Sequence, residues 1–107
     1  MMGNILEMVQ KQVRLEAWKA LTKPQRVFLA GADECTPPNE RAVRFGWSGI
    51  GARGPALRVA AHLSKLGLVE YVGHGRHDDD DNGDAERAIY AITDKGRAAL
   101  KGGHDAR

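Results

Sequence analysis

The stretch PALRVAAHLSKLGLVEYV, residues 55–72, carries the clearest structural pattern of the chain. Its first part has apolar residues at helical spacing: Ala56, Val59, Ala60, Leu63 and Leu66. Gly54-Pro55 opens that part with a proline in the first turn, where its missing N–H costs no hydrogen bond, and Gly67 provides a stop. The next residues, LVEYV (68–72), are rich in β-branched and aromatic side chains. The stretch therefore predicts a helix over 55–66 that leads directly into a strand.

A second strand and a last helix are predicted further along the chain. RAIYAI (87–92) has strand composition, and the polar, turn-rich segment before it joins the two strands into an antiparallel hairpin over 68–92. The tip of this hairpin, residues 77–86, reads HDDDDNGDAE and is strongly acidic. Thr93 is predicted to cap a C-terminal helix over 93–101, which Gly102-Gly103 would end.

An N-terminal helix is predicted over residues 1–21, with Asn4 as its N-cap. One apolar stripe of this helix is suited to the domain core, while Met8, Leu15 and Trp18 project elsewhere. These three residues predict a dimer interface. In the alternative, which stays open here, the C-terminal helix of the same chain covers them.

A helical core is predicted over residues 22–67. Thr22-Lys-Pro-Gln25 matches a capping box and starts a helix at residue 23 that buries Val27 and Phe28 and ends near Gly31. Residues 33–54 hold two consecutive prolines and four glycines, so only a short helix over 39–45 is predicted there. The predicted fold class is a mainly α protein with a small antiparallel hairpin, an α+β domain.

Composition narrows the class of protein. The chain has 107 residues, 42% of them apolar and 28% charged, which is typical of a single soluble domain. No stretch is apolar enough to span a membrane, and the N-terminus lacks the features of a signal peptide. Cys35 is the only cysteine, which excludes an internal disulfide and fits a reducing compartment. We therefore expect a cytoplasmic protein.

The charge is unevenly distributed along the chain. Residues 78–86 hold six acids and no base, so the rest of the chain carries 16 bases against 8 acids. Between residues 41 and 76 there are six bases and a single acid, Glu70. This pattern indicates a surface that faces a polyanion, with a separate acidic loop. The alternative is that both blocks are solvated surface.

Two motifs carry a resemblance to a known family. HLSKLGLVEY (62–71) and YAITDKGRAAL (90–100) occur in the order and places that resemble the MarR- and PadR-type bacterial transcription regulators. The resemblance implies a winged helix-turn-helix fold, with 55–66 as the recognition helix and 68–92 as the wing. We therefore expect a transcription regulator that binds double-stranded DNA without a cofactor, as the homodimer that Met8, Leu15 and Trp18 predict. The segment 46–54 is longer than the three- or four-residue turn of a helix-turn-helix motif.

The candidate DNA-binding residues are mostly on the predicted recognition helix. Arg58, Ala61, His62 and Lys65 share the helix face opposite the apolar stripe, at offsets of 0, 3, 4 and 7. Such a face can present donors to base edges and phosphates in a major groove. Other candidates are Arg53 before the helix, Arg44 in the basic stretch, and, by the resemblance, Arg76 and Arg87 at the base of the wing.

Other chemistry is weakly supported by the sequence. Residues 49–54 match G-x-G-x-x-G, but no parallel βαβ unit surrounds them, so dinucleotide binding is not expected. His74, His77 and the aspartates are competent metal ligands, yet no thiolate lies nearby, and no metal site is predicted. No nucleophile motif is present, so an enzyme is not expected. A redox role for Cys35 is also not favoured.

The acidic loop leaves two functions open. In the first, the wing tip swings clear of DNA and disfavours nonspecific sites. In the second, the winged-helix domain is a protein–protein interaction module or a phage-type accessory protein, and the acidic loop binds a basic protein partner. The sequence alone does not distinguish these functions.

Overall fold

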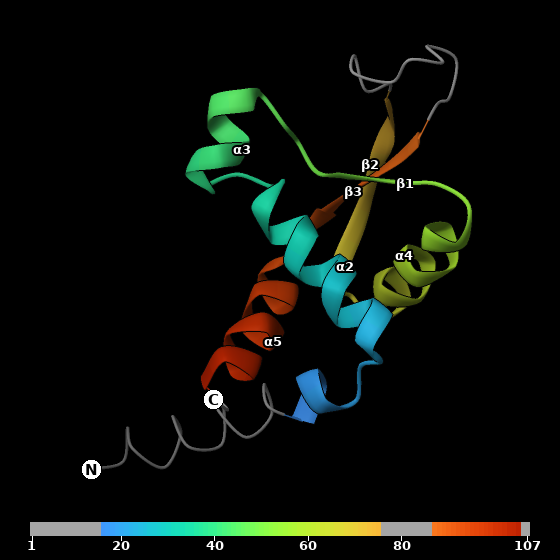
Figure 1. The fold of residues 1–107 in the computed structure, drawn as a ribbon, viewed down its shortest axis with the longest axis vertical. Helices are drawn as coiled ribbons and strands as arrows, with labels where there is room; N and C mark the ends of the chain where they lie inside the picture. The colour runs from blue at the N-terminus through green and yellow to red at the C-terminus, as the bar shows by residue number, and fades with distance from the viewer. Residues whose placement is uncertain (1–15, 76–86, 106–107) are drawn as a thin grey trace.

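The protein is a small α+β domain in which helices pack on a three-stranded antiparallel sheet (Figure 1). The computed structural model describes residues 16–75 and 87–105. In chain order the elements are α2 (Lys23–Glu34), α3 (Glu40–Phe45), β1 (Ile50–Ala52), α4 (Pro55–Lys65), β2 (Val69–Gly75), β3 (Arg87–Ile92) and α5 (Asp94–Asp105). Residues 16–19 are also helical and belong to the predicted N-terminal helix.

The sheet has the strand order β1-β3-β2, with both neighbours antiparallel to β3. The hairpin is confirmed: β3 has the predicted bounds, and β2 begins one residue later than expected and extends to Gly75. A bulge between Tyr71 and Gly73 inserts Val72 as an extra residue. The sequence predicted no strand before α4, but residues 50–52 form β1 and pair with β3, with Ile50 opposite Tyr90.

Helix α2 begins where the capping box predicted. The Thr22 hydroxyl accepts from the Gln25 backbone N–H, and the Gln25 side chain accepts from the Thr22 N–H at 2.9 Å. The predicted end near Gly31 is wrong, since α2 continues to Glu34. Gly31 instead lies inside α2 and packs closely on Ile50: a Cβ at position 31 would lie 2.9 Å from Cδ1 of Ile50. The expected burial of Val27 is also wrong, because its side chain is 65% exposed.

Helices α3 and α4 agree with the sequence. Asn39 caps α3 through a hydrogen bond from the Arg41 N–H, and Gly46 ends it in the left-handed conformation. Helix α4 starts at Pro55 as expected, and Gly67 follows it with a φ of 77°. Leu66, placed on the apolar stripe of α4 by its spacing, is 40% exposed because it lies at the C-cap, beyond the packed part of the helix.

Helix α5 is longer than predicted, because it runs through Gly102-Gly103 to Asp105. Those glycines were expected to end it. Gly103 instead faces the indole ring of Trp18, and a Cβ there would lie 2.3 Å from the ring. Gly103, which has no side chain, therefore lets α5 pack closely against the helical residues 16–19.

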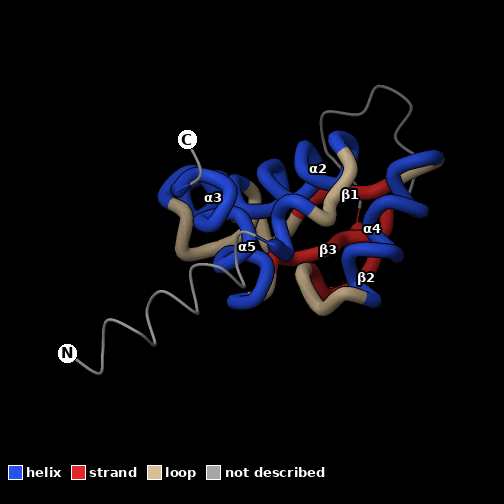
Figure 2. Tube along the Cα trace, turned by 90° about the horizontal axis from the view of Figure 1, so that it is seen from below, coloured by secondary structure: helices blue, strands red, loops and turns tan. Residues whose placement is uncertain are grey.

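The core lies where α2 and α4 pack on each other and on the sheet, and α5 packs against α2 beside it (Figure 2). Leu29, Leu63 and Val69 are the largest fully buried side chains, one from each of α2, α4 and β2. Leu68 and Ile92 close the core at the base of the hairpin. None of the helices described for this chain combines the length and the apolar character needed to cross a bilayer.

Candidate nucleic-acid interface

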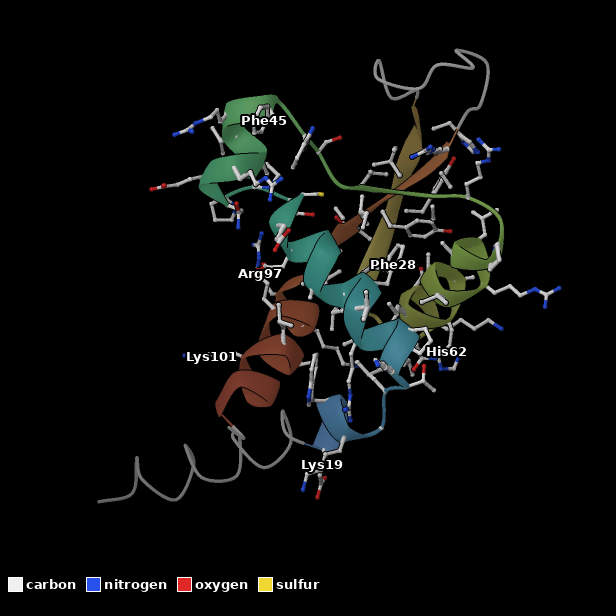
Figure 3. All side chains as sticks on the ribbon, in the orientation of Figure 1. Lys19, Phe28, Phe45, His62, Arg97 and Lys101 are labelled. Carbon is white, nitrogen blue, oxygen red and sulfur yellow. The ribbon has the colours of Figure 1, made fainter. Side chains whose placement is uncertain are left out.

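Helix α4 has one face in the core and one face in solvent. Ala60 and Leu63 are buried on its inner face. On its outer face Arg58, Ala61, His62 and Lys65 are all exposed, as their spacing predicted. Pro55–Lys65 contains no acidic residue, so the formal charges on this outer face, those of Arg58 and Lys65, are both positive. Figure 3 shows His62 on the side of the molecule away from α5 and its Lys101.

The start of α4 adds to this positive region. Gly54 is the N-cap with a φ of 62°, and it offers no side chain to the first N–H groups of the helix. The first turn has no acidic residue, and Arg53 directly before it is exposed. An uncapped N-terminus beside an arginine favours an anionic group such as a phosphate.

The hairpin lies beside α4, because β2 follows α4 directly and packs against it. Arg87 is half-buried and opens β3 opposite Gly75. The expectation that it lies at the base of the hairpin is wrong, because this pair is at the end next to the acidic segment, whereas Val69 and Ile92 pair at the base. On β2 the Tyr71 ring is half exposed and stacks edge-on against Tyr90, and its hydroxyl bonds to Nδ1 of His74. Arg76 and the acidic tip are outside the described residues, as are His77 and the aspartates of the metal alternative.

Arg44 does not join the other candidates. It is exposed on α3, which Figures 1 and 2 place at the opposite end of the sheet from α4. Its neighbours form a separate cluster: the Phe45 and Trp47 rings stack with centroids 5.1 Å apart, and the Arg41 guanidinium lies 5.6 Å from the Trp47 ring. Phe45 is 60% exposed. These three residues, Arg41, Phe45 and Trp47, are called the α3 cluster below. The cluster was not predicted, because none of the three belongs to a recognisable motif.

The predicted dimer residues are only partly described. Trp18 packs within its own chain, against Gly103 of α5 and beneath the Arg26 guanidinium at 5.2 Å. For this side chain the structure therefore matches the alternative in which the C-terminal helix covers it. Met8 and Leu15 lie outside the described residues.

Sequence reasoning missed an apolar groove between α2, β1 and α4, with a volume of about 710 Å³. It is lined by Lys23, Pro24, Val27, Phe28, Gly31, Ile50, Gly51, Pro55, Ala56 and Val59. The available signal was the spacing of Pro24, Val27 and Gly31, which share one side of α2. The sequence did not show that β1 would form the groove's far wall.

Cys35 is half-buried at the C-cap of α2. Burial raises the pKa of its thiol, the Glu34 carboxylate raises it further, and Arg41 partly offsets both. A thiol with a raised pKa stays protonated at neutral pH and reacts slowly. This environment gives no support to a redox role.

The chain was also compared with known proteins. No protein-family model matches it, and neither the curated proteins nor the solved structures include a match to it.

Proposed function

We propose that the protein is a winged-helix regulator that binds double-stranded DNA, with α4 as its recognition helix and the β2–β3 hairpin as its wing. The observation that carries the proposal is the outer face of α4, where Arg58, His62 and Lys65 are exposed in a row with no acid among them. Homodimer formation, expected from the surplus apolar residues of the N-terminal helix, remains part of this proposal.

The dimensions suit major-groove binding. A helix of 11 residues is about 16 Å long, and an α-helix fits the B-DNA major groove, which is about 12 Å wide. Arg58 and Lys65 are two turns apart and can reach base edges or phosphates on the same groove face. Arg53, at the uncapped N-terminus, is suited to a phosphate contact that fixes the orientation of the helix.

The helix that supports α4 is not the one that precedes it in sequence. The segment between α3 and α4 contains β1, whereas α2 packs directly on α4. In the proposed complex α2 therefore takes the place of the first helix of a helix-turn-helix pair. The sheet order β1-β3-β2 supports a wing beside α4, because it leaves β2 at the edge next to that helix.

The proposal is tested with the double variant Arg58→Ala/Lys65→Ala. Both side chains are exposed, so the fold should be retained, while DNA affinity should fall by about 1–3 kcal/mol for each residue that contacts a base. If both contact phosphates instead, the slope of log affinity against log salt should decrease by about 0.9 for each of them. Gel-shift titrations of random duplex at two salt concentrations measure both effects.

The matched control is Lys19→Ala/Lys101→Ala, which removes the same charge from two exposed lysines away from the outer face of α4 (Figure 3). This control should lose far less affinity than the α4 variant. Equal losses in the two variants would mean that binding depends on net charge alone, and would contradict recognition by α4.

The second candidate function is a protein–protein interaction module, and the α3 cluster favours it. Arginine and tryptophan are enriched at the energetic centres of protein interfaces, and Phe45 presents an exposed ring stacked on Trp47. Under this function Phe45→Ala should abolish capture of a partner and leave DNA binding unchanged.

A further inference from the structure

We propose that the groove between α2, β1 and α4 binds an amphipathic anion, a small molecule with an apolar body and a single anionic head. This site is separate from the outer face of α4, because α4 contributes Pro55, Ala56 and Val59 to the groove.

The walls of the groove are apolar. Phe28, Ile50 and Val59 are buried or half-buried in it, and Val27 stands at the edge with 65% of its side chain exposed. An apolar ligand in the groove would cover the exposed Val27 side chain. Burial of that apolar surface would contribute favourably to the free energy of binding. The body of the ligand is therefore hydrocarbon.

The dimensions are those of a small-molecule site. Lys23 and Gly31 lie at the two ends of the α2 wall, so the groove is about 12 Å long at the helical rise of 1.5 Å per residue. Its volume of about 710 Å³ falls in the ordinary range of ligand pockets. These dimensions suit an extended chain or a small ring system.

The charge of the groove selects an anion. Lys23 is the one charged residue among those that line it. The N-terminal ends of both α2 and α4 border it through Pro24 and Pro55, and neither helix has an acidic residue in its first turn. The positive ends of two helix dipoles and one ammonium group therefore act on the same hollow, and no carboxylate is among the described residues that line it.

The groove also connects to the proposed function. Helix α4 has Val59 in the groove and Arg58 on its outer face, so a ligand inserted between α2 and α4 would displace the outer face with the helix. An occupied groove should therefore change the affinity of the protein for DNA. Only this part of the inference rests on the proposed function, DNA binding by α4.

The test is titration of the protein with decanoate and with decyltrimethylammonium, followed by amide chemical shifts in NMR. Decanoate should bind one-to-one and shift the amides of Val27, Gly31 and Val59. It should bind about tenfold more tightly than the cation, from the combined effect of Lys23 and the two helix ends. Octanoate should bind about fourfold more weakly than decanoate, as expected when two methylene groups are half-buried.

Two variants locate the site. Val27→Asp should weaken decanoate binding at least tenfold, because it adds a carboxylate to the edge of the groove. Val43→Asp is its matched control, since Val43 is 62% exposed but lies on α3, and it should bind decanoate as the unmodified chain does. Lys23→Gln should weaken binding about two- to fivefold, the usual range for an exposed ion pair.

Equal affinity for the two amphiphiles, or equal binding by Val27→Asp and Val43→Asp, would overturn the proposal. Gel shifts with and without decanoate then test the link to DNA separately. If decanoate binds the groove and the protein does not bind DNA, the proposed function fails while the ligand site stands.

Discussion

Thr93, Gly96 and Arg97 show what single residues do at the junction of β3 and α5. The Thr93 hydroxyl donates to the Gly67 carbonyl at 2.6 Å and accepts from the Gly96 N–H at 3.1 Å, which caps α5 and ties it to the end of α4. The Arg97 guanidinium donates to Asp33 at 3.3 Å and to the carbonyl oxygen of Thr36 at 3.3 Å. The Thr-x-x-Gly-Arg motif therefore joins α5 to both the end of α4 and the C-terminal part of α2.

Gly96 provides a prediction at this scale. A Cβ at position 96 would lie 2.0 Å from the carbonyl oxygen of Leu68, a backbone atom in the buried turn between α4 and β2. We expect Gly96→Ala to lower the free energy of unfolding by about 2–3 kcal/mol, despite the higher helix propensity of alanine. Urea denaturation measures this, with the exposed neighbour Lys95→Ala as control. A stability equal to that of the control would show that the backbone at Leu68 moves to make room for the added methyl group.

At the scale of elements, glycine is the residue whose role the sequence left ambiguous. Gly67 ends α4 with a positive φ, as predicted. Gly31 and Gly103 were expected to end helices and instead lie inside them, because Ile50 and Trp18 occupy the space of their missing side chains. A glycine that ends a helix and a glycine that allows close packing look the same in the sequence. The residue that packs against the second kind is distant in the chain.

The start of α2, in contrast, depends on neighbouring residues alone. Thr22→Ala removes the hydroxyl that accepts from the Gln25 N–H, and we expect a loss of about 1 kcal/mol in unfolding free energy. Thr22→Ser retains the hydroxyl and should stay within about 0.5 kcal/mol of the unmodified chain. Thermal unfolding of the two variants side by side measures the difference. Equal destabilisation by both would assign the effect to the lost methyl group.

At the scale of the whole molecule, charge is divided between two places. The outer face of α4 is cationic, whereas the loop between Gly75 and Arg87 contains Asp78–Asp81 and two further acids. In the proposed DNA complex this loop repels phosphates at low salt. At physiological ionic strength, charges separated by more than about 8 Å are largely screened.

The acidic loop distinguishes the two candidate functions. If the protein binds DNA, replacing Asp78–Asp81 with asparagine should strengthen binding to random duplex, with the largest gain at low salt. Stability should hardly change. Gel shifts across a salt series measure the gain, and pull-down from lysate runs in parallel. Loss of a basic partner without any gain on DNA would instead favour the interaction module.

The sequence by itself determined the features that depend on short-range patterns. The outer face of α4 follows from offsets of three, four and seven residues, the capping box of α2 from a spacing of three, and the bounds of β3 from its composition. These features form because the interacting groups are within about two turns of one another. The main candidate residues, Arg58, His62 and Lys65, were therefore placed correctly on an exposed face.

Only the tertiary structure decided the features that join distant segments. Strand β1 has just three residues, Ile-Gly-Ala, and it is a strand because β3, some 40 positions further on, supplies its hydrogen-bonding partner. The groove exists because that strand holds Ile50 against Gly31 beside α4, and Arg44 is separated from α4 because β1 carries the chain across the sheet between them. In each case the stabilising contact joins two residues that lie far apart in the sequence. Neither residue has a local sequence pattern that identifies its partner.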